Sequence, residues 1–238
     1  MKVSFSKALV RLTFRGLMLT ALLLCLISLA LDSLEYLVLG QDVPLEVLGY
    51  KLDVDIDRLD VDEEQSIPAW FSSSVLLLCS VLLAIITATL KRTGERYVPH
   101  WGALAILFAL LSLDESISVH ERFVEPLRSL LGVSGLLYFA WVVPGGAFVV
   151  ILALAYRRYV FDLPAESRRL FIVAGTLYLS GVLGLEMIGG LWVDLYGQQN
   201  WAYHGFATVE ELLEMSGAIL FLYALMQYLG SLENPRAG

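Results

Sequence analysis

The feature that most constrains this chain is a series of apolar stretches, each close to the length that crosses a lipid bilayer. A membrane-spanning helix needs about 20 mostly apolar residues, and a hydrophobic share of 58% is high for a soluble domain. We therefore predict an all-α, polytopic integral membrane protein: a bundle of six transmembrane helices in a single domain, residues 1–238. The predicted spans are 16–39, 70–90, 101–121, 135–156, 170–192 and 208–229.

The first apolar stretch also has a second interpretation. A basic start, an apolar run and Ser28-Leu-Ala30 fit a cleavable signal peptide. We favour a retained helix because apolar residues resume at Leu37.

The distribution of basic residues predicts the orientation of the bundle. Lysine and arginine gather in the N-terminal residues, in loops 91–100 and 157–169 and in the tail. The other loops, 41–68, 122–134 and 193–207, hold only Lys51, Arg58, Arg122 and Arg128. Because basic loops stay in the cytoplasm, both termini are expected there. We predict the plasma (inner) membrane as the location, with the candidate site facing the extracytoplasmic side.

The acidic loop 41–68 is expected outside the cytoplasm. Its segment from Tyr50 to Asp62 alternates polar and apolar residues, which predicts a strand or hairpin. The aspartates at every second position from Asp53 to Asp57 have the spacing of a calcium-binding loop, but the glycine and the final glutamate of an EF-hand are missing. A solvated acidic face is the favoured interpretation.

Ionisable residues within the predicted spans mark the candidate site. The stretch from Ser112 to Glu121 follows an apolar run that is too short to cross the membrane alone, so Asp114 is expected inside the bilayer. At 1.5 Å per residue, Asp114, Glu186 and Glu214 lie about 20, 24 and 21 Å from the inner boundary. Charged groups at such depth are costly and usually functional. Several carboxylates at one depth repel each other, which favours protonation of some of them or a cation bound among them.

A divalent metal ion is the predicted cofactor, because carboxylates and imidazoles are ligands of zinc, manganese and iron. The predicted metal ligands are Asp114, Glu115, His120, Glu121, Glu186, His204, Glu210 and Glu214. Asp114 and Glu115 are also the candidate catalytic residues.

Some of these residues have a purely structural interpretation as well. Thr208-Val-Glu-Glu211 matches a helix capping box. Asp114 or Glu115 could form a buried pair with Arg122, and Glu186 could hydrogen-bond a neighbouring helix. His120 and His204 could be interfacial anchors.

Helix geometry also restricts the site. On an unbroken helix Asp114 and His120 point to different sides, so they share one site only if the helix bends. Pro144-Gly-Gly146 is expected to kink or break the fourth span. The fifth span is rich in glycine, including Gly181, and small residues let membrane helices approach closely.

The favoured function is a metal-dependent intramembrane enzyme of the lipid-hydrolase type, with a dinuclear-metal oxidoreductase as a variant. A metal-bound water near the outer leaflet could attack an ester, amide or phosphoryl bond of a membrane lipid, the expected partner. A net charge of −8 argues against a nucleic-acid partner. The alternatives are a proton- or cation-coupled transporter or channel that uses the same carboxylates, and a non-catalytic membrane subunit. Transport is less favoured because the inner half of the bundle holds few polar groups.

Overall fold

A computed structural model describes residues 5–39, 46–47, 50–51, 56–63, 65–198 and 200–233. It contains six helices that are long and apolar enough to cross a membrane, which confirms the predicted all-α, six-span fold. The spanning helices are α1 (Lys7–Leu39), α2 (Ile67–Thr93), α3 (Val98–Ile117), α5 (Val142–Asp162), the continuous segment α6 (Ala165–Leu179), η4 (Ser180–Leu185) and α7 (Glu186–Tyr196), and α8 (Trp201–Glu233). The short elements are β1 (Glu46–Val47), β2 (Tyr50–Lys51), η1 (Ile56–Leu59), η2 (Glu121–Phe123), α4 (Val124–Leu131) and η3 (Gly135–Leu137).

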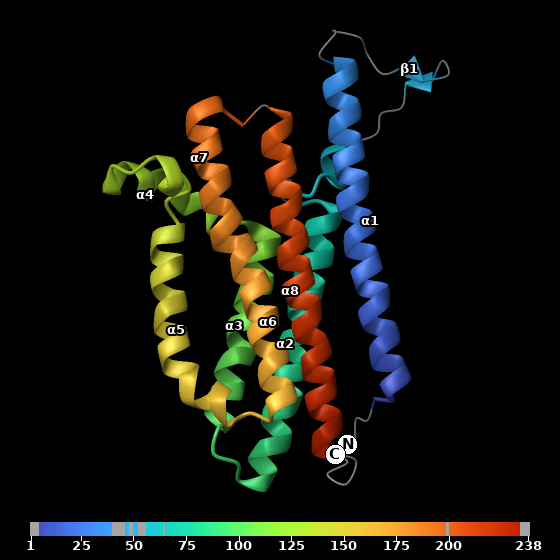
Figure 1. The fold of residues 1–238 in the computed structure, drawn as a ribbon, viewed down its shortest axis with the longest axis vertical. Helices are drawn as coiled ribbons and strands as arrows, with labels where there is room; N and C mark the ends of the chain where they lie inside the picture. The colour runs from blue at the N-terminus through green and yellow to red at the C-terminus, as the bar shows by residue number, and fades with distance from the viewer. Residues whose placement is uncertain are drawn as a thin grey trace.

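Helix α8 is the central helix of the bundle and packs against α1, α2 and α6 (Figure 1). Its fully buried side chains include Met215, Ile219 and Leu225, which belong to the main apolar core. Helix α5 lies at the edge of the bundle and contacts α6 and η4 through only a few residues. A cavity lies between α5 and the neighbouring helices α3, α6 and α8.

Two glycines allow α6 and η4 to lie directly against α8. A Cβ atom on Gly217 would lie 2.6 Å from the backbone nitrogen of Tyr178, and one on Gly181 would lie 2.6 Å from Cγ of Glu214. No side chain fits at either position without moving a neighbour. The prediction that small residues of the fifth span serve close helix packing is confirmed at Gly181.

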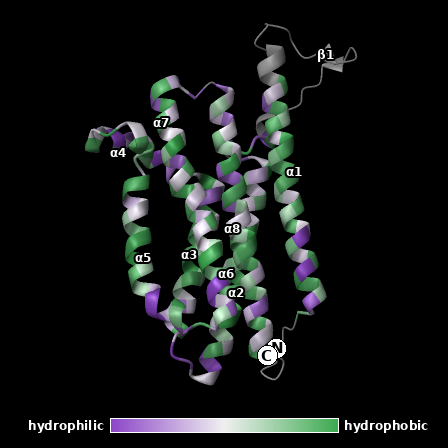
Figure 2. Cartoon of the chain, viewed as in Figure 1, coloured by the Kyte–Doolittle hydropathy of each residue, from purple (hydrophilic) through white to green (hydrophobic). Residues whose placement is uncertain are grey.

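The start of α1 and the end of α8 lie at the same end of the bundle (Figure 1). The loops that join α2 to α3 and α5 to α6 lie there too. Figure 2 shows apolar residues along the middle of the helices and polar residues concentrated toward their ends. The position of the two termini at one end of the bundle agrees with an even number of spans. The cytoplasmic location of this end remains a prediction.

The predicted strand or hairpin over 50–62 is only partly correct. The described strands form a short antiparallel pair, with Glu46 opposite Lys51, and Ile56–Leu59 is a 3-10 helix. The turn that follows is closed by the carboxylate of Asp60, which accepts a hydrogen bond from the backbone N–H of Asp62 at 3.0 Å. Asp side chains favour such turns over extended strand. Asp53, Asp55 and the side chain of Asp57 lie outside the described residues.

The prediction that Pro144-Gly-Gly146 kinks the fourth span is wrong. Helix α5 begins at Val142, so Pro144 occupies its first turn. Proline is tolerated there because N–H groups in the first turn have no partner within the helix, so the missing N–H of proline costs no hydrogen bond. The fourth span accordingly covers 142–162 rather than 135–156.

Candidate functional site

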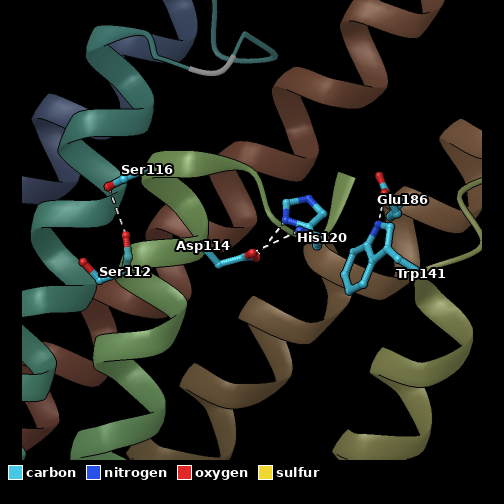
Figure 3. Close-up of polar contacts among 6 residues, drawn as sticks. All are labelled: Ser112, Asp114, Ser116, His120, Trp141 and Glu186. Atoms are coloured by element: carbon cyan, nitrogen blue, oxygen red, sulfur yellow. Dashed lines mark hydrogen bonds and ion pairs between the residues drawn. The ribbon is translucent and has the colours of Figure 1, made fainter. Parts of the chain in front are cut away.

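A break after α3 brings Asp114 and His120 together. The third span ends at Ile117 rather than at 121, because Ser118 adopts a left-handed backbone conformation with φ of 52°. The chain folds back, and the carboxylate of Asp114 accepts a hydrogen bond from the backbone N–H of His120 at 3.1 Å. Its other oxygen lies 2.8 Å from Nδ1 of the same residue (Figure 3). The bend that a shared site requires is therefore present, and Asp114 pairs with His120, whereas Arg122 is exposed.

Trp141 connects this pair to Glu186. The His120 and Trp141 rings lie 4.9 Å apart, edge to face, and the indole N–H of Trp141 donates a hydrogen bond to Oε1 of Glu186 at 2.6 Å (Figure 3). Glu186 follows directly on the π-helix η4. Such widened turns are frequent at functional sites because they change the direction of the side chains that follow.

The acidic residues of α8 face this region. The capping-box interpretation of Thr208–Glu211 is wrong, because α8 begins seven residues earlier, at Trp201, and the hydroxyl of Thr208 donates to the carbonyl of His204 within the helix. Glu210 shares a side-chain hydrogen bond with Glu186. Glu214 is 7% exposed and lies against η4 at Gly181.

Most of the predicted site residues therefore meet at one level of the bundle. Electrostatic interactions join the side chains of five glutamates, here called the carboxylate cluster: Glu115, Glu186, Glu210, Glu211 and Glu214. The Asp114–His120 pair borders this cluster, since His120 interacts with the charge of Glu186. Glu121 is exposed at the start of η2, and its charge also acts on His120.

The pKa of His120 reflects two opposing effects. Burial lowers the pKa of the imidazole and is the largest single effect, but the hydrogen bond and charge of Asp114, together with the charges of Glu121 and Glu186, raise it by more. The pKa of His120 therefore lies above its ordinary value. A carboxylate on one ring nitrogen also orients the imidazole and selects which nitrogen holds the proton.

An apolar cavity of about 440 Å³ adjoins this polar region. It lies between α3, α5, α6 and α8, and its walls include Phe108, Leu152, Phe171 and Phe221. Trp141, at the start of α5, lines the cavity and also contacts His120 and Glu186. The volume is within the range of small-molecule sites, about 300–1,000 Å³.

His204 lies apart from the carboxylate cluster, in a separate group with Asp32 and Asp60. One potential ligand atom from each of these residues lies within 4.8 Å of the other two. Within the described part of the chain, this is the one group of three His, Cys, Asp or Glu side chains that meets this condition. The other predicted ligands do not converge to the same degree.

Comparison with known proteins places the chain in a family. The family described as "Domain of unknown function (DUF8692)" matches residues 16–229, which extends from the first span to the last. The chain belongs to the DUF8692 family. No curated protein and no solved structure matches it.

Some site residues of this DUF8692 protein are not found by sequence reasoning. Trp141 lies within the predicted fourth span and belongs to no motif, and its bond to Glu186 depends on tertiary structure. Asp60 is one of several aspartates in the acidic loop. Only its contacts with Ser28 and with the group of Asp32 and His204 distinguish it from the others. The π-helix has one sequence signal, the glycines at Gly181 and Gly184 just before Glu186.

Proposed function

We propose that this DUF8692 protein is a membrane-embedded enzyme that hydrolyses an acyl ester of a membrane lipid. The observation that carries the proposal is the meeting of the Asp114–His120 pair and Glu186 at Trp141, which lines an apolar cavity. An apolar cavity in the membrane suits a lipid acyl chain. A chain bound there would have its carbonyl group near the polar end.

The roles of the residues follow from their contacts. Asp114 accepts the hydrogen bond from Nδ1–H of His120, which leaves Nε2 as the base. A water molecule transfers a proton to Nε2 while its oxygen bonds to the ester carbonyl carbon. The carbon–oxygen bond to the alcohol then breaks, and the alcohol oxygen takes up a proton. The products are a carboxylic acid and an alcohol.

The Glu186–Glu210 pair is the proposed proton donor to the leaving alcohol. Two carboxyl groups can share a hydrogen bond only when one of them carries a proton. The proton that His120 acquires then returns to this pair through water, which restores the starting state. The indole of Trp141 holds the Glu186 carboxyl group in place between the cavity and His120.

Transport of protons or cations through the same carboxylates is the alternative. It is less well supported, because the cavity on the inner side of the carboxylate cluster is lined mainly by apolar side chains such as Leu107, Phe108 and Leu152. An ion path needs polar groups along its length. A lipid acyl chain needs no such polar groups.

The test uses the full chain reconstituted in vesicles of a defined phospholipid, with released fatty acid measured by mass spectrometry. His120→Asn and Glu186→Gln are expected to lower the release rate by about 10²- to 10⁴-fold, the usual contribution of acid–base groups. His100→Asn, at the opposite end of the bundle, is the matched control and should retain the wild-type rate. Release that His120→Asn leaves unchanged would contradict the proposal.

A cavity variant separates lipid binding from acid–base chemistry. Gly175 lines the cavity, and a Cβ atom added there has no neighbour within 4 Å. Gly175→Leu should therefore fill part of the cavity without a steric clash and slow release from long-chain lipids. Gly16→Leu, on the exposed face of α1 with equally open surroundings, is the control. Equal rates in the two variants would exclude the cavity as the lipid site.

A further inference from the structure

Three segments that are distant in sequence bring metal-ligand atoms together at the outer end of the bundle. Asp32 is on α1, Asp60 follows η1, and His204 is in the first turn of α8. One ligand atom from each lies within 4.8 Å of the others. We propose that these three residues bind a divalent transition-metal ion, a site distinct from the proposed lipid-hydrolysing site.

The imidazole of His204 provides the observation that points to a ligand. Its Nδ1 atom is buried and has no hydrogen-bond partner among the residues that the structure describes. Buried polar atoms nearly always have a partner, and an exception calls for an explanation such as an ion. Neutral imidazole nitrogen is the commonest protein ligand of transition metals.

Asp32 is buried, and Asp60 is held in a way that suits ligation. Asp32 is 7% exposed. The Oδ1 atom of Asp60 accepts hydrogen bonds from the hydroxyl of Ser28 at 3.2 Å and from the backbone N–H of Asp62 at 3.0 Å. Both bonds are made to Oδ1, so Oδ2 can serve as the ligand atom. Hydrogen bonds of this kind orient metal-ligating carboxylates in known sites.

Charge also favours an ion at this position. Two carboxylates a few ångströms apart in a partly buried site repel each other, and a cation between them removes that repulsion. One imidazole with two carboxylates suits Zn²⁺ or Mn²⁺, since Ca²⁺ and Mg²⁺ prefer oxygen ligands alone. The bound ion would join the loop after η1 to α1 and α8.

Metal binding is tested on the full chain, purified in detergent and stripped with a chelator. Zn²⁺ binding is measured by calorimetry, with Mn²⁺ and Mg²⁺ as competitors, and bound metal is counted by elemental analysis. We expect one ion per chain, displaced by Mn²⁺ more readily than by Mg²⁺. His204→Asn and Asp60→Asn should weaken Zn²⁺ binding by more than 100-fold, beyond the 10- to 100-fold loss typical of second-shell changes.

Two controls distinguish this site from its alternatives. His120→Asn should keep wild-type Zn²⁺ affinity, and so should His100→Asn, which alters another buried, unpartnered Nδ1 atom. Ser28→Ala, which keeps all three ligands, should weaken binding by about 10-fold. Loss of the ion in His120→Asn with retention in His204→Asn would place the metal in the carboxylate cluster and overturn the proposal. Absence of stoichiometric binding to the wild-type chain would also overturn it.

Discussion

At the scale of single residues, the left-handed backbone at Ser118 has the largest consequence for the site. A residue other than glycine with a φ of 52° is uncommon, and such a conformation costs about 1 kcal/mol or more. The carbonyl of Asp114 accepts the Ser118 N–H at 2.7 Å, and the Asp114 side chain accepts the N–H of His120. Asp114 therefore supports the turn with both its backbone and its side chain, which offsets the strain.

The raised pKa of His120 predicts how the rate of lipid hydrolysis depends on pH. The base must be neutral, so the rate should rise as pH increases through the pKa of His120, above the ordinary histidine value. Asp114→Asn removes the carboxylate that raises this pKa. The midpoint of the acidic limb of the pH–rate profile should then move to lower pH, with a lower maximal rate. An unshifted midpoint would mean that another group controls this limb.

The same pair predicts a pH-dependent stability. Because the folded-state pKa of His120 is raised, protonation stabilises the folded state; this contribution is complete below the unfolded pKa and is lost as pH rises through the folded pKa. Asp114→Asn should therefore lower the unfolding temperature more at pH 5.5 than at pH 9. The difference should correspond to about 1 kcal/mol.

At the scale of elements, the contact between η4 and α8 decides where the carboxylates lie. A Cβ atom on Gly181 would be 2.8 Å from the backbone oxygen of Glu210 as well as 2.6 Å from Cγ of Glu214. The wider turn of the π-helix and the missing side chain together let two acid-bearing helices touch. Helices α2 and α3 also lie close together, and serines join them: the hydroxyls of Ser73 and Ser112 each donate a hydrogen bond to the other residue's backbone carbonyl at 2.8 Å.

This helix contact gives a prediction with a control in the same π-helix. Gly181→Ala should destabilise the protein by about 1–3 kcal/mol, the usual cost of overpacking, because backbone and Glu214 must move apart. Gly184→Ala changes the same residue type at an exposed position with nothing within 4 Å. It should be neutral or slightly stabilising, since alanine is the better helix former. Thermal unfolding in detergent measures both, and equal effects would contradict the close contact.

At the scale of the whole molecule, the two polar sites lie toward the end of the bundle opposite the start of α1 and the end of α8. Aromatic side chains pack together toward the other end of the bundle. Trp101 stacks on Tyr228, with ring centroids 4.7 Å apart, and makes edge-to-face contacts with Tyr159 and Phe171.

The predicted orientation can be tested with single cysteines at the two ends. Gln198 lies between α7 and α8, and Arg92 is in the last turn of α2; both are exposed, at opposite ends of the bundle. The native Cys25 and Cys79 are buried. A membrane-impermeant maleimide should label Gln198→Cys in intact cells and Arg92→Cys only after permeabilisation. The opposite pattern would reverse the orientation and place both sites on the cytoplasmic side.

The sequence by itself determined the class of fold, because apolar length alone decides whether a helix can span a bilayer. It also predicted a common level for Asp114, Glu186 and Glu214, since helical rise converts residue number into depth; their depth in the membrane stays a prediction. Tertiary structure decided which of these residues meet. The pairing of Asp114 with His120 depends on the turn at Ser118, and the separate group around His204 depends on how the loop after η1 folds back. The first is a local effect of a left-handed turn at a residue other than glycine, and the second follows from contacts between distant segments. Neither leaves a periodic signal in a single sequence.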